Sequence, residues 1–171
     1  VSDAPVEAPV NTKTTGEAAT PTVIAANQAV EKFLDFDDRS DFDLAERGFI
    51  ATFEDTKILN ADGSLAYDFG AYDFLDADAP DTVNPSLWRQ SKLAAKHGLF
   101  EVVDGIYQVR AFDLSNITFI RGETGWIVVD PLISKEPAAR AKALVDRELG
   151  ERPVTAVIFT HSHIDHYGGV R

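Results

Sequence analysis

The feature that most constrains this chain is a short strand that runs directly into a histidine-rich turn. Residues 154–159 read Val-Thr-Ala-Val-Ile-Phe, a β-branched apolar run typical of a fully buried strand. Residues 160–169 follow at once, read Thr-His-Ser-His-Ile-Asp-His-Tyr-Gly-Gly, and hold three of the four histidines of the protein. The strand therefore delivers three imidazoles and a carboxylate to one end of a sheet, where ligands of α/β proteins gather. This combination predicts a metal site.

The spacing within the turn allows two metal ions. Alternate residues of an extended segment point the same way, so His161, His163 and Asp165 can converge on one side. His166 follows Asp165 directly and diverges from it unless the backbone turns. One simple solution places His161 and His163 on a first metal and Asp165 with His166 on a second. Imidazole and carboxylate donors suit Zn²⁺, with Fe and Mn as alternatives, and two such ions can activate a shared water and clamp an anionic leaving oxygen.

Other interpretations of the turn are weaker. A surface turn or a purification tag would have no reason to follow an apolar strand, and the residues are not homopolymeric. Nucleophilic catalysis by Ser162 lacks the surrounding Gly-x-Ser-x-Gly elbow. The chain has no cysteine, so any metal must be held by histidine and carboxylate.

Charge and hydropathy argue against several partners. The net charge of −12 disfavours nucleic acid and an anionic membrane surface, because both require clustered Lys and Arg. A local positive pocket for an anionic substrate remains compatible with this charge. No apolar run approaches the roughly 20 residues needed to span a bilayer, so we expect no membrane span.

The first half of the chain reads as a lead-in followed by helices and loops. Residues 1–21 mix Pro, Thr, Ala and Glu without period and predict a flexible lead-in. The start at Val1 rather than Met is compatible with removal of a leader or tag. Residues 22–98 form the next predicted segment, with a helix capped by Thr22 and a short helix over residues 41–47.

Within this segment the turn signals are local. Asn-Ala-Asp-Gly at residues 60–63 predicts a hairpin, and Asn84 with Pro85 predicts the start of a helix. The acidic and aromatic residues 72–81 lack calcium-loop spacing, so we interpret them as a solvated loop pinned by buried aromatics. His97, near the end of the predicted helix, is interpreted as structural, with an imidazolium favouring the helix dipole.

From residue 99 the pattern changes to strands. A two-residue turn at Asp104-Gly105 predicts one hairpin, and a second hairpin, a helix and the strand before the metal motif follow. The predicted elements cover residues 100–103, 106–110, 117–120, 126–129, 136–149 and 154–159. This order of hairpins followed by β–α–β predicts the first half of a layered α/β unit.

The sequence also resembles a known family. Residues 160–166, Thr-His-Ser-His-Ile-Asp-His, resemble the His-x-His-x-Asp-His signature of the metallo-β-lactamase superfamily. That resemblance implies an αββα sandwich with one or two metals at its open edge, and leaves the substrate open among lactams, thioesters, phosphodiesters, lactones and sulfate esters. Further blocks look like the alkylsulfatase branch, typified by the SDS hydrolases, and extend the similarity over roughly residues 22–171. These blocks are residues 82–90, 97–100, 105–110, 113–120 and 125–132.

The resemblance implies a function and a setting. It implies a binuclear zinc enzyme that releases sulfate from alkyl sulfate esters, usually exported and dimeric, hence a periplasmic or secreted homodimer. Carried over by position, His161 and His163 would hold one zinc, and Asp165 and His166 the other. Asp165 could also orient the attacking water as the catalytic residue. The alternatives are another hydrolase of the same fold, such as a phosphodiesterase or thioesterase, or a catalytically incompetent fragment.

Family members are several times longer and supply further ligands after this motif, together with dimerisation and lipid-carrier-like domains. We therefore expect residues 99–171 to be the incomplete N-terminal half of the metallo-β-lactamase-like domain, either as a fragment or as a subunit completed by another chain. Alone, this piece is expected to bind zinc weakly and to turn over nothing.

Four further residues received roles from the sequence. Asp130, at a strand end, is a candidate to receive an imidazole N–H beside the metal, or merely caps the following turn. Arg89, Arg110 and Arg121 are candidates for sulfate contact by bidentate pairing, although a structural role is favoured for each.

Overall fold

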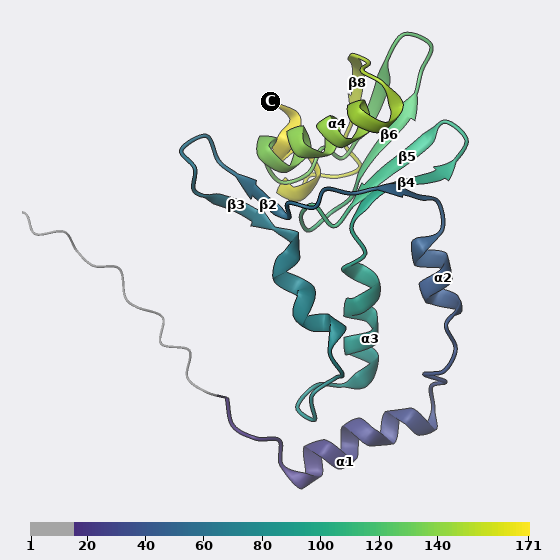
Figure 1. Cartoon of the computed structure of the whole chain (residues 1–171), viewed down its shortest axis with the longest axis vertical. Coiled ribbons are helices and arrows are strands. Elements are labelled where there is room, and N and C mark those ends of the chain that lie inside the picture. Colours follow the sequence, from purple (N-terminus) through teal and green to yellow (C-terminus); the bar gives the residue numbers. More distant parts are fainter. Residues whose placement is uncertain (1–15) are drawn as a thin grey trace, which may run out of the picture.

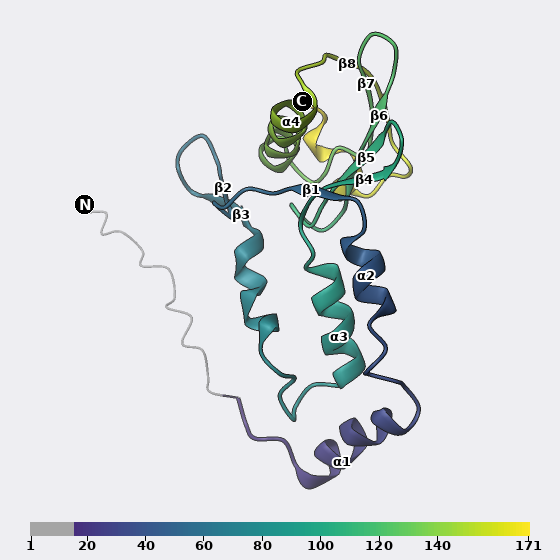
Figure 2. The same ribbon diagram turned by 45° about the vertical axis from the view of Figure 1, so that its right-hand side comes forward.

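The computed structural model of the protein describes residues 16–171, which form a helical part and a sheet part (Figures 1 and 2). Residues 1–15, most of the predicted lead-in, lie outside the described residues. The α-helices are α1 (Pro21–Ala29), α2 (Ser40–Glu46), α3 (Pro85–Ala94) and α4 (Lys135–Leu149). The 3-10 helices are η1 (Val30–Lys32), η2 (Phe69–Asp76), η3 (Ile164–His166) and η4 (Gly168–Val170).

The strands form one six-stranded sheet and one hairpin. They are β1 (Phe49–Ala51), β2 (Lys57–Leu59), β3 (Leu65–Asp68), β4 (Gly98–Val103), β5 (Ile106–Arg110), β6 (Ile117–Arg121), β7 (Trp126–Val129) and β8 (Val154–Ile158). The large sheet has the order β1-β4-β5-β6-β7-β8, and β2 pairs with β3. Its neighbours are antiparallel except β7 and β8, which are parallel and joined through α4. The predicted hairpins and the closing β–α–β unit are confirmed.

Local sequence explains most helix boundaries. Asn84 caps α3 as predicted, since its side chain accepts a hydrogen bond from the Ser86 amide at 2.9 Å. For α1 the cap is Thr20 rather than the predicted Thr22, because Pro21 takes the first helical position, where its missing N–H costs nothing. Residues 72–76 of the loop predicted over residues 72–81 belong to η2, and the expectation of buried aromatics there was wrong, because Tyr72 and Phe74 are 41% and 60% exposed and Leu75 is the residue that is buried.

The core lies between the sheet, the helix α4 and the β2–β3 hairpin. Its largest fully buried side chains include Trp126, Phe119, Phe112 and Leu144. Burial of each large apolar side chain contributes about 1.5–3 kcal/mol. Ile58 of β2 belongs to the same cluster, so the first half of the chain contributes to the core of the sheet.

One aromatic side chain, Phe53 in the connection between β1 and β2, packs against α4. The guanidinium carbons of Arg140 and Arg147 lie 3.6 Å and 4.6 Å from the centroid of the Phe53 ring. Arg147 also donates to the backbone oxygen of Thr52, and Arg140 to that of Asp55. Cation–π contact and these hydrogen bonds hold the helix over the sheet.

The domain boundary predicted between residues 98 and 99 is crossed by the sheet. β1, from the N-terminal segment, pairs with β4, with Phe49 opposite Phe100. Below the sheet stand α2, η2 and α3, and α1 lies farthest from it (Figure 1). Among residues 16–171, no helix has both the length and the hydropathy required to cross a bilayer.

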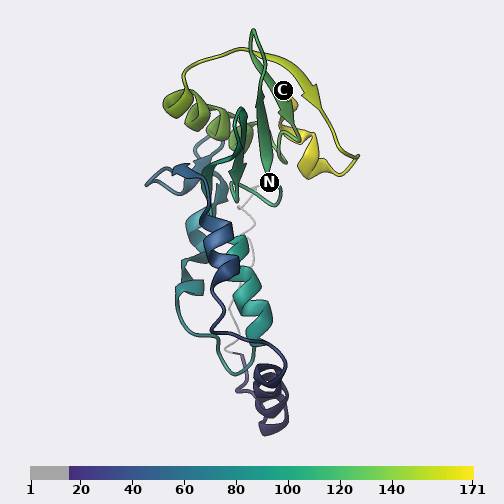
Figure 3. The same cartoon turned by 90° about the vertical axis from the view of Figure 1, so that its right-hand side faces the viewer.

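The prediction that residues 154–159 form a fully buried strand was wrong. All five residues of β8 are exposed, with Val157 at 38% and Ile158 at 50%. β8 is the last strand of the sheet and pairs only with β7 (Figure 3). An apolar run shows that a strand has apolar faces, whereas position in the sheet decides whether anything covers them.

Candidate metal centre

The histidine-rich turn lies at one edge of the large sheet, where β7 and β8 end and β6 begins. Because β7 and β8 are parallel, their carboxyl ends lie side by side, and Thr160 is held there by Asp130 from the other strand. The chain then turns through η3, where the His166 amide donates to the His163 carbonyl at 3.0 Å. The sequence left open whether the backbone turns after Asp165. It does, and the turn carries His166 back toward the other ligands.

The four predicted ligands lie together as two pairs. His161 Nε2 is 3.1 Å from His163 Nδ1, and His166 Nε2 is 3.3 Å from Asp165 Oδ2. The pairs are adjacent, since the ring centroids of His161 and His166 are 4.0 Å apart. His161 and His163 are exposed, and Asp165 and His166 are partly buried.

The two pairs fit the spacing of metal ligands. Two nitrogen or oxygen donors at about 2.0–2.1 Å from a tetrahedral zinc stand about 3.3 Å from one another. Both observed separations are close to this value, and imidazole and carboxylate are donors that zinc accepts. A catalytic zinc requires at least three protein ligands, and among residues 16–171 no group of three or more His, Asp or Glu side chains is arranged to hold an ion. The four ligands therefore stay a prediction in which each pair supplies part of a site.

Asp130 makes the contact that the sequence suggested. It is 7% exposed, and its Oδ1 accepts the Thr160 amide at 2.8 Å. Its Oδ2 accepts the Thr160 hydroxyl at 2.7 Å and lies 2.9 Å from His166 Nδ1. Burial alone would raise the pKa of the Asp130 carboxyl, but the hydrogen bonds from Thr160 and His166 outweigh burial, and the pKa lies below its usual value.

The contact with Asp130 indicates the tautomer of His166. An ionised carboxylate only accepts hydrogen bonds, so the Nδ1 of His166 must carry the proton that it shares with Asp130. The lone pair of Nε2 is then available on the side that faces Asp165. Carboxylate–imidazole pairs of this kind orient metal-binding histidines.

Two residues of the β5–β6 loop also support the turn and were missed as site residues. Asp113, 5% exposed, accepts the Ser115 amide through Oδ1 and the Ile133 amide through Oδ2, both at 2.8 Å. Burial, partly offset by these hydrogen bonds, raises the pKa of the Asp113 carboxyl. Ser115 donates its hydroxyl to the backbone oxygen of Asp165. The Asp-x-Ser pattern signals a local turn, but not a contact with a residue 50 positions away.

Glycine permits the close approach that follows the ligands. A Cβ on Gly169 would lie 2.0 Å from the Pro131 oxygen and 2.7 Å from the Ala138 Cβ, so only glycine fits there. The Gly169 amide donates to the Leu132 oxygen at 3.0 Å.

The three candidate arginines serve structural contacts. Arg89 and Arg110 donate to backbone oxygens in and just before α2. Arg121 donates to the Tyr107 hydroxyl at 3.0 Å. It lies opposite Trp126 in the pairing of β6 with β7, at the end of these strands away from the metal motif. The structural role favoured from the sequence therefore accounts for all three side chains.

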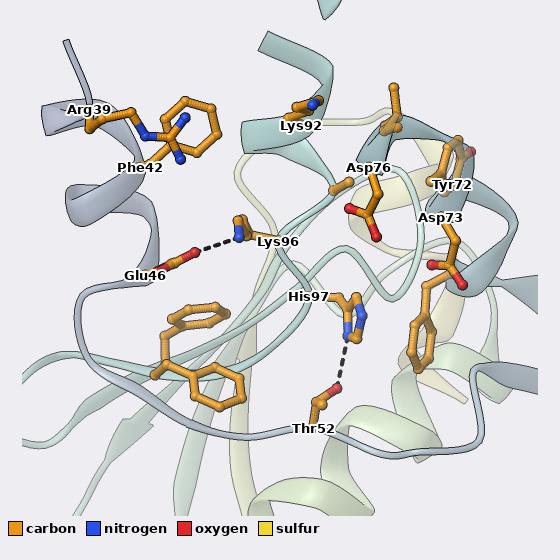
Figure 4. A pocket seen from close by; sticks show the side chains of 15 residues that line it. Arg39, Phe42, Glu46, Thr52, Tyr72, Asp73, Asp76, Lys92, Lys96 and His97 are labelled. Atoms are coloured by element: carbon orange, nitrogen blue, oxygen red, sulfur yellow. Dashed lines mark hydrogen bonds and ion pairs between the residues drawn. The ribbon is translucent and has the colours of Figure 1, made fainter. Parts of the chain in front are cut away.

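A separate cavity of about 710 Å³ lies among α2, η2, α3 and the sheet (Figure 4). Arg39 and Lys92 lie on one side of it and Asp73 and Asp76 on another (Figure 4). His97, which lines it, is 2.9 Å from the Thr52 hydroxyl. Burial lowers the pKa of His97, so the imidazolium expected at the helix end is wrong and the ring is neutral near pH 7. The metal motif does not reach this cavity.

Comparison with known proteins agrees with the architecture. Residues 110–171 match the model of the Metallo-beta-lactamase superfamily. The chain is 52% identical over 159 residues to a linear primary-alkylsulfatase of Pseudomonas sp., covering 92% of this chain and 24% of that protein. It is 46% identical over 152 residues to an alkyl/aryl-sulfatase of Saccharomyces cerevisiae, covering 88% of this chain and 24% of that protein.

A solved structure gives the same result in three dimensions. The stereoselective inverting sec-alkylsulfatase of Pseudomonas sp. superposes with a TM-score of 0.84 at 47% identity, covering 91% of this chain and 24% of that chain. The sheet, its histidine-bearing edge and residues 110–171, which match the family model, show the fold of the metallo-β-lactamase superfamily. Within the superfamily it is an alkylsulfatase-like domain, which spans about a quarter of the length of these relatives. The predicted family and fold class are confirmed.

Proposed function

We propose that this chain provides the first metal-binding segment of a metal-dependent hydrolase that releases sulfate from alkyl sulfate esters. The proposal rests on two adjacent pairs of candidate metal ligands, His161 with His163 and Asp165 with His166, at the ends of β7 and β8. The substrate class comes from the alkylsulfatases to which the chain is similar.

The proposed ligands divide as their spacing does. His161 and His163 hold one zinc, and Asp165 and His166 hold the other. Zinc supplies positive charge for the sulfate oxygens and lowers the pKa of water. Asp130 keeps the proton of His166 on Nδ1, so that the lone pair of Nε2 remains available to a metal ion. Asp165, the residue we assign to catalysis, orients the attacking water through its carboxylate.

Export and dimerisation belong to the same proposal. Both rest on resemblance to the alkylsulfatase branch, as does the periplasmic or secreted location. The isolated residues 1–171 hold only part of each ligand set, so we propose that they bind zinc weakly and do not turn over substrate. Activity is then a property of the longer protein to which such a segment contributes.

The test measures sulfate released from dodecyl sulfate by the intact protein. We expect chelator to abolish release and His163→Ala to reduce it at least about 100-fold, because a ligand of one zinc is lost. The matched control is Ser162→Ala, one residue away in the same turn, which should retain activity. Release that survives both chelator and His163→Ala would refute the metal mechanism.

A substrate comparison separates sulfate esters from the alternatives. Equal concentrations of an alkyl sulfate, a phosphodiester and a thioester are offered to the same preparation. We expect the sulfate ester to have the highest kcat/KM. A higher value for the phosphodiester or the thioester would reject the substrate class and leave the metal site standing.

A further inference from the structure

The second ligand pair is held from a loop outside the motif. The peptide that joins Asp165 to His166 begins at the Asp165 carbonyl, and Ser115 donates its hydroxyl to that oxygen. Ser115 is only 9% exposed and lies 50 residues away in the sequence. Because this peptide connects the two ligands, fixing its carbonyl fixes the direction in which both side chains leave the backbone.

Ser115 is itself held by a buried carboxylate. Asp113 accepts the Ser115 amide and the Ile133 amide, each at 2.8 Å, and so joins the β5–β6 loop to the segment before α4. Both donors are backbone groups, which cannot rotate away as a side chain does. The Ser115 hydroxyl is therefore presented from a rigid support.

Backbone strain is concentrated in two segments, the β5–β6 loop and the segment between β7 and α4. Among residues 16–171, the residues other than glycine with positive φ are Ala111 at 57°, Asp130 at 54° and Leu132 at 65°. Each such residue costs about 1–3 kcal/mol and persists only where surrounding contacts enforce it. Among the described residues, this strain lies at Asp130 and Leu132 and close to Asp113 and Ser115, and not within the ligand turn.

The two ligand pairs consequently differ in support. The Asp165–His166 pair is held twice, by Ser115 at its backbone and by Asp130 at the His166 ring. In the other pair, His161 meets the Thr160 hydroxyl at 2.9 Å, and both histidines are exposed. A held pair loses less conformational freedom when an ion binds.

We propose that Ser115, held by the buried Asp113, is a positioning residue for the Asp165–His166 ligand pair and for no other part of the metal centre. The inference rests on the proposed metal site. It adds that the second zinc depends on a hydroxyl outside the histidine motif, while the first zinc does not.

The test is a zinc titration of the intact protein, made metal-free, against a chromogenic chelator. Supports outside the ligand set change metal affinity by about 10–100-fold when they are removed. In a His163→Ala background, which leaves the second pair, we expect Ser115→Ala to weaken the remaining zinc by about that factor. In a His166→Ala background, which leaves the first pair, Ser115→Ala should not change zinc affinity.

Two controls separate positioning from a general loss of structure. Ser115→Thr keeps the hydroxyl and should restore affinity, whereas Leu114→Ala, at a neighbouring residue 75% exposed, should leave it unchanged. Equal weakening by Ser115→Ala in both backgrounds, or none in either, would overturn the inference while leaving the metal proposal intact. A parent protein that binds no zinc would refute the proposed function itself, and the inference with it.

Discussion

The exchange of Asp130 for asparagine tests how the metal turn is organised. In Asp130→Asn the amide oxygen can keep the bond that Oδ1 accepts from the Thr160 amide. The amide nitrogen replaces Oδ2, which faces the Thr160 hydroxyl at 2.7 Å and His166 Nδ1 at 2.9 Å. That nitrogen donates, so the hydroxyl must rotate to accept and His166 must move its proton from Nδ1 to Nε2.

The exchange is expected to cost free energy in both the fold and the site. A hydrogen bond to a charged group contributes about 1 kcal/mol more than a neutral one, so the two bonds at Oδ2 lose about 2 kcal/mol of stability. With its proton on Nε2, His166 no longer offers a lone pair toward Asp165. Zinc affinity of the Asp165–His166 pair should therefore fall about 10–100-fold.

Two measurements check the exchange. Long-range proton–nitrogen NMR spectra of metal-free protein labelled at histidine nitrogen should show His166 protonated on Nδ1 before the exchange and on Nε2 after it. Zinc titration should show the loss of affinity in parallel. The control Asp104→Asn makes the same chemical change in an exposed turn and should alter neither. A variant that weakens zinc binding while His166 keeps its Nδ1 proton would refute the tautomer argument.

Three other outcomes follow from single features of the structure. Burial lowers the pKa of His97 below its ordinary 6.5, so between the folded and unfolded pKa values the unfolded chain binds more protons than the folded chain. The contribution of His97 to stability should therefore be complete above pH 6.5 and fall as pH falls through that window. Urea unfolding of His97→Gln at several pH values should lose this dependence. Gly169→Ala forces a Cβ to within 2.0 Å of a backbone oxygen and should lower the free energy of unfolding in urea by about 1–3 kcal/mol. In the control Gly16→Ala the added Cβ has nothing within 4 Å, so the free energy of unfolding should not change. Ile158 is exposed on β8, the edge strand, so Ile158→Lys in residues 1–171 expressed alone should reduce self-association measured by sedimentation velocity. The free energy of unfolding should change by no more than about 0.5 kcal/mol. Unchanged self-association would show that the molecules do not associate through β8.

The parts predicted well from the sequence are those decided by neighbouring residues. Asp104 with Gly105 specifies a two-residue hairpin, and Asn84 followed by proline specifies a helix start, without reference to the rest of the fold. The closeness of His161 and His163 also follows from their spacing. Such features need only a few residues and the stereochemistry of the backbone.

The parts that escaped prediction depend on distant contacts. The burial of residues 154–158 depends on the order of strands in the sheet, which the apolar run does not encode. The support of Asp165 by Ser115 joins residues 50 positions apart, and the neutral state of His97 follows from packing against Thr52 and Phe69. Each of these requires knowledge of which segments meet.

The division between the supporting loops and the ligand turn has a consequence for how this edge can change its chemistry. The strained residues and the buried carboxylates Asp113 and Asp130 lie in segments that precede the histidine motif. Residues 161–163 of the turn are exposed. Changes in the exposed turn should therefore disturb stability little, since surface substitutions generally cost less than about 0.5 kcal/mol. Changes at Asp113 remove an acceptor from two backbone amides and should disturb both the fold and the second ligand pair. The buried carboxylates and the exposed histidines His161 and His163 are thus carried by separate pieces of sequence.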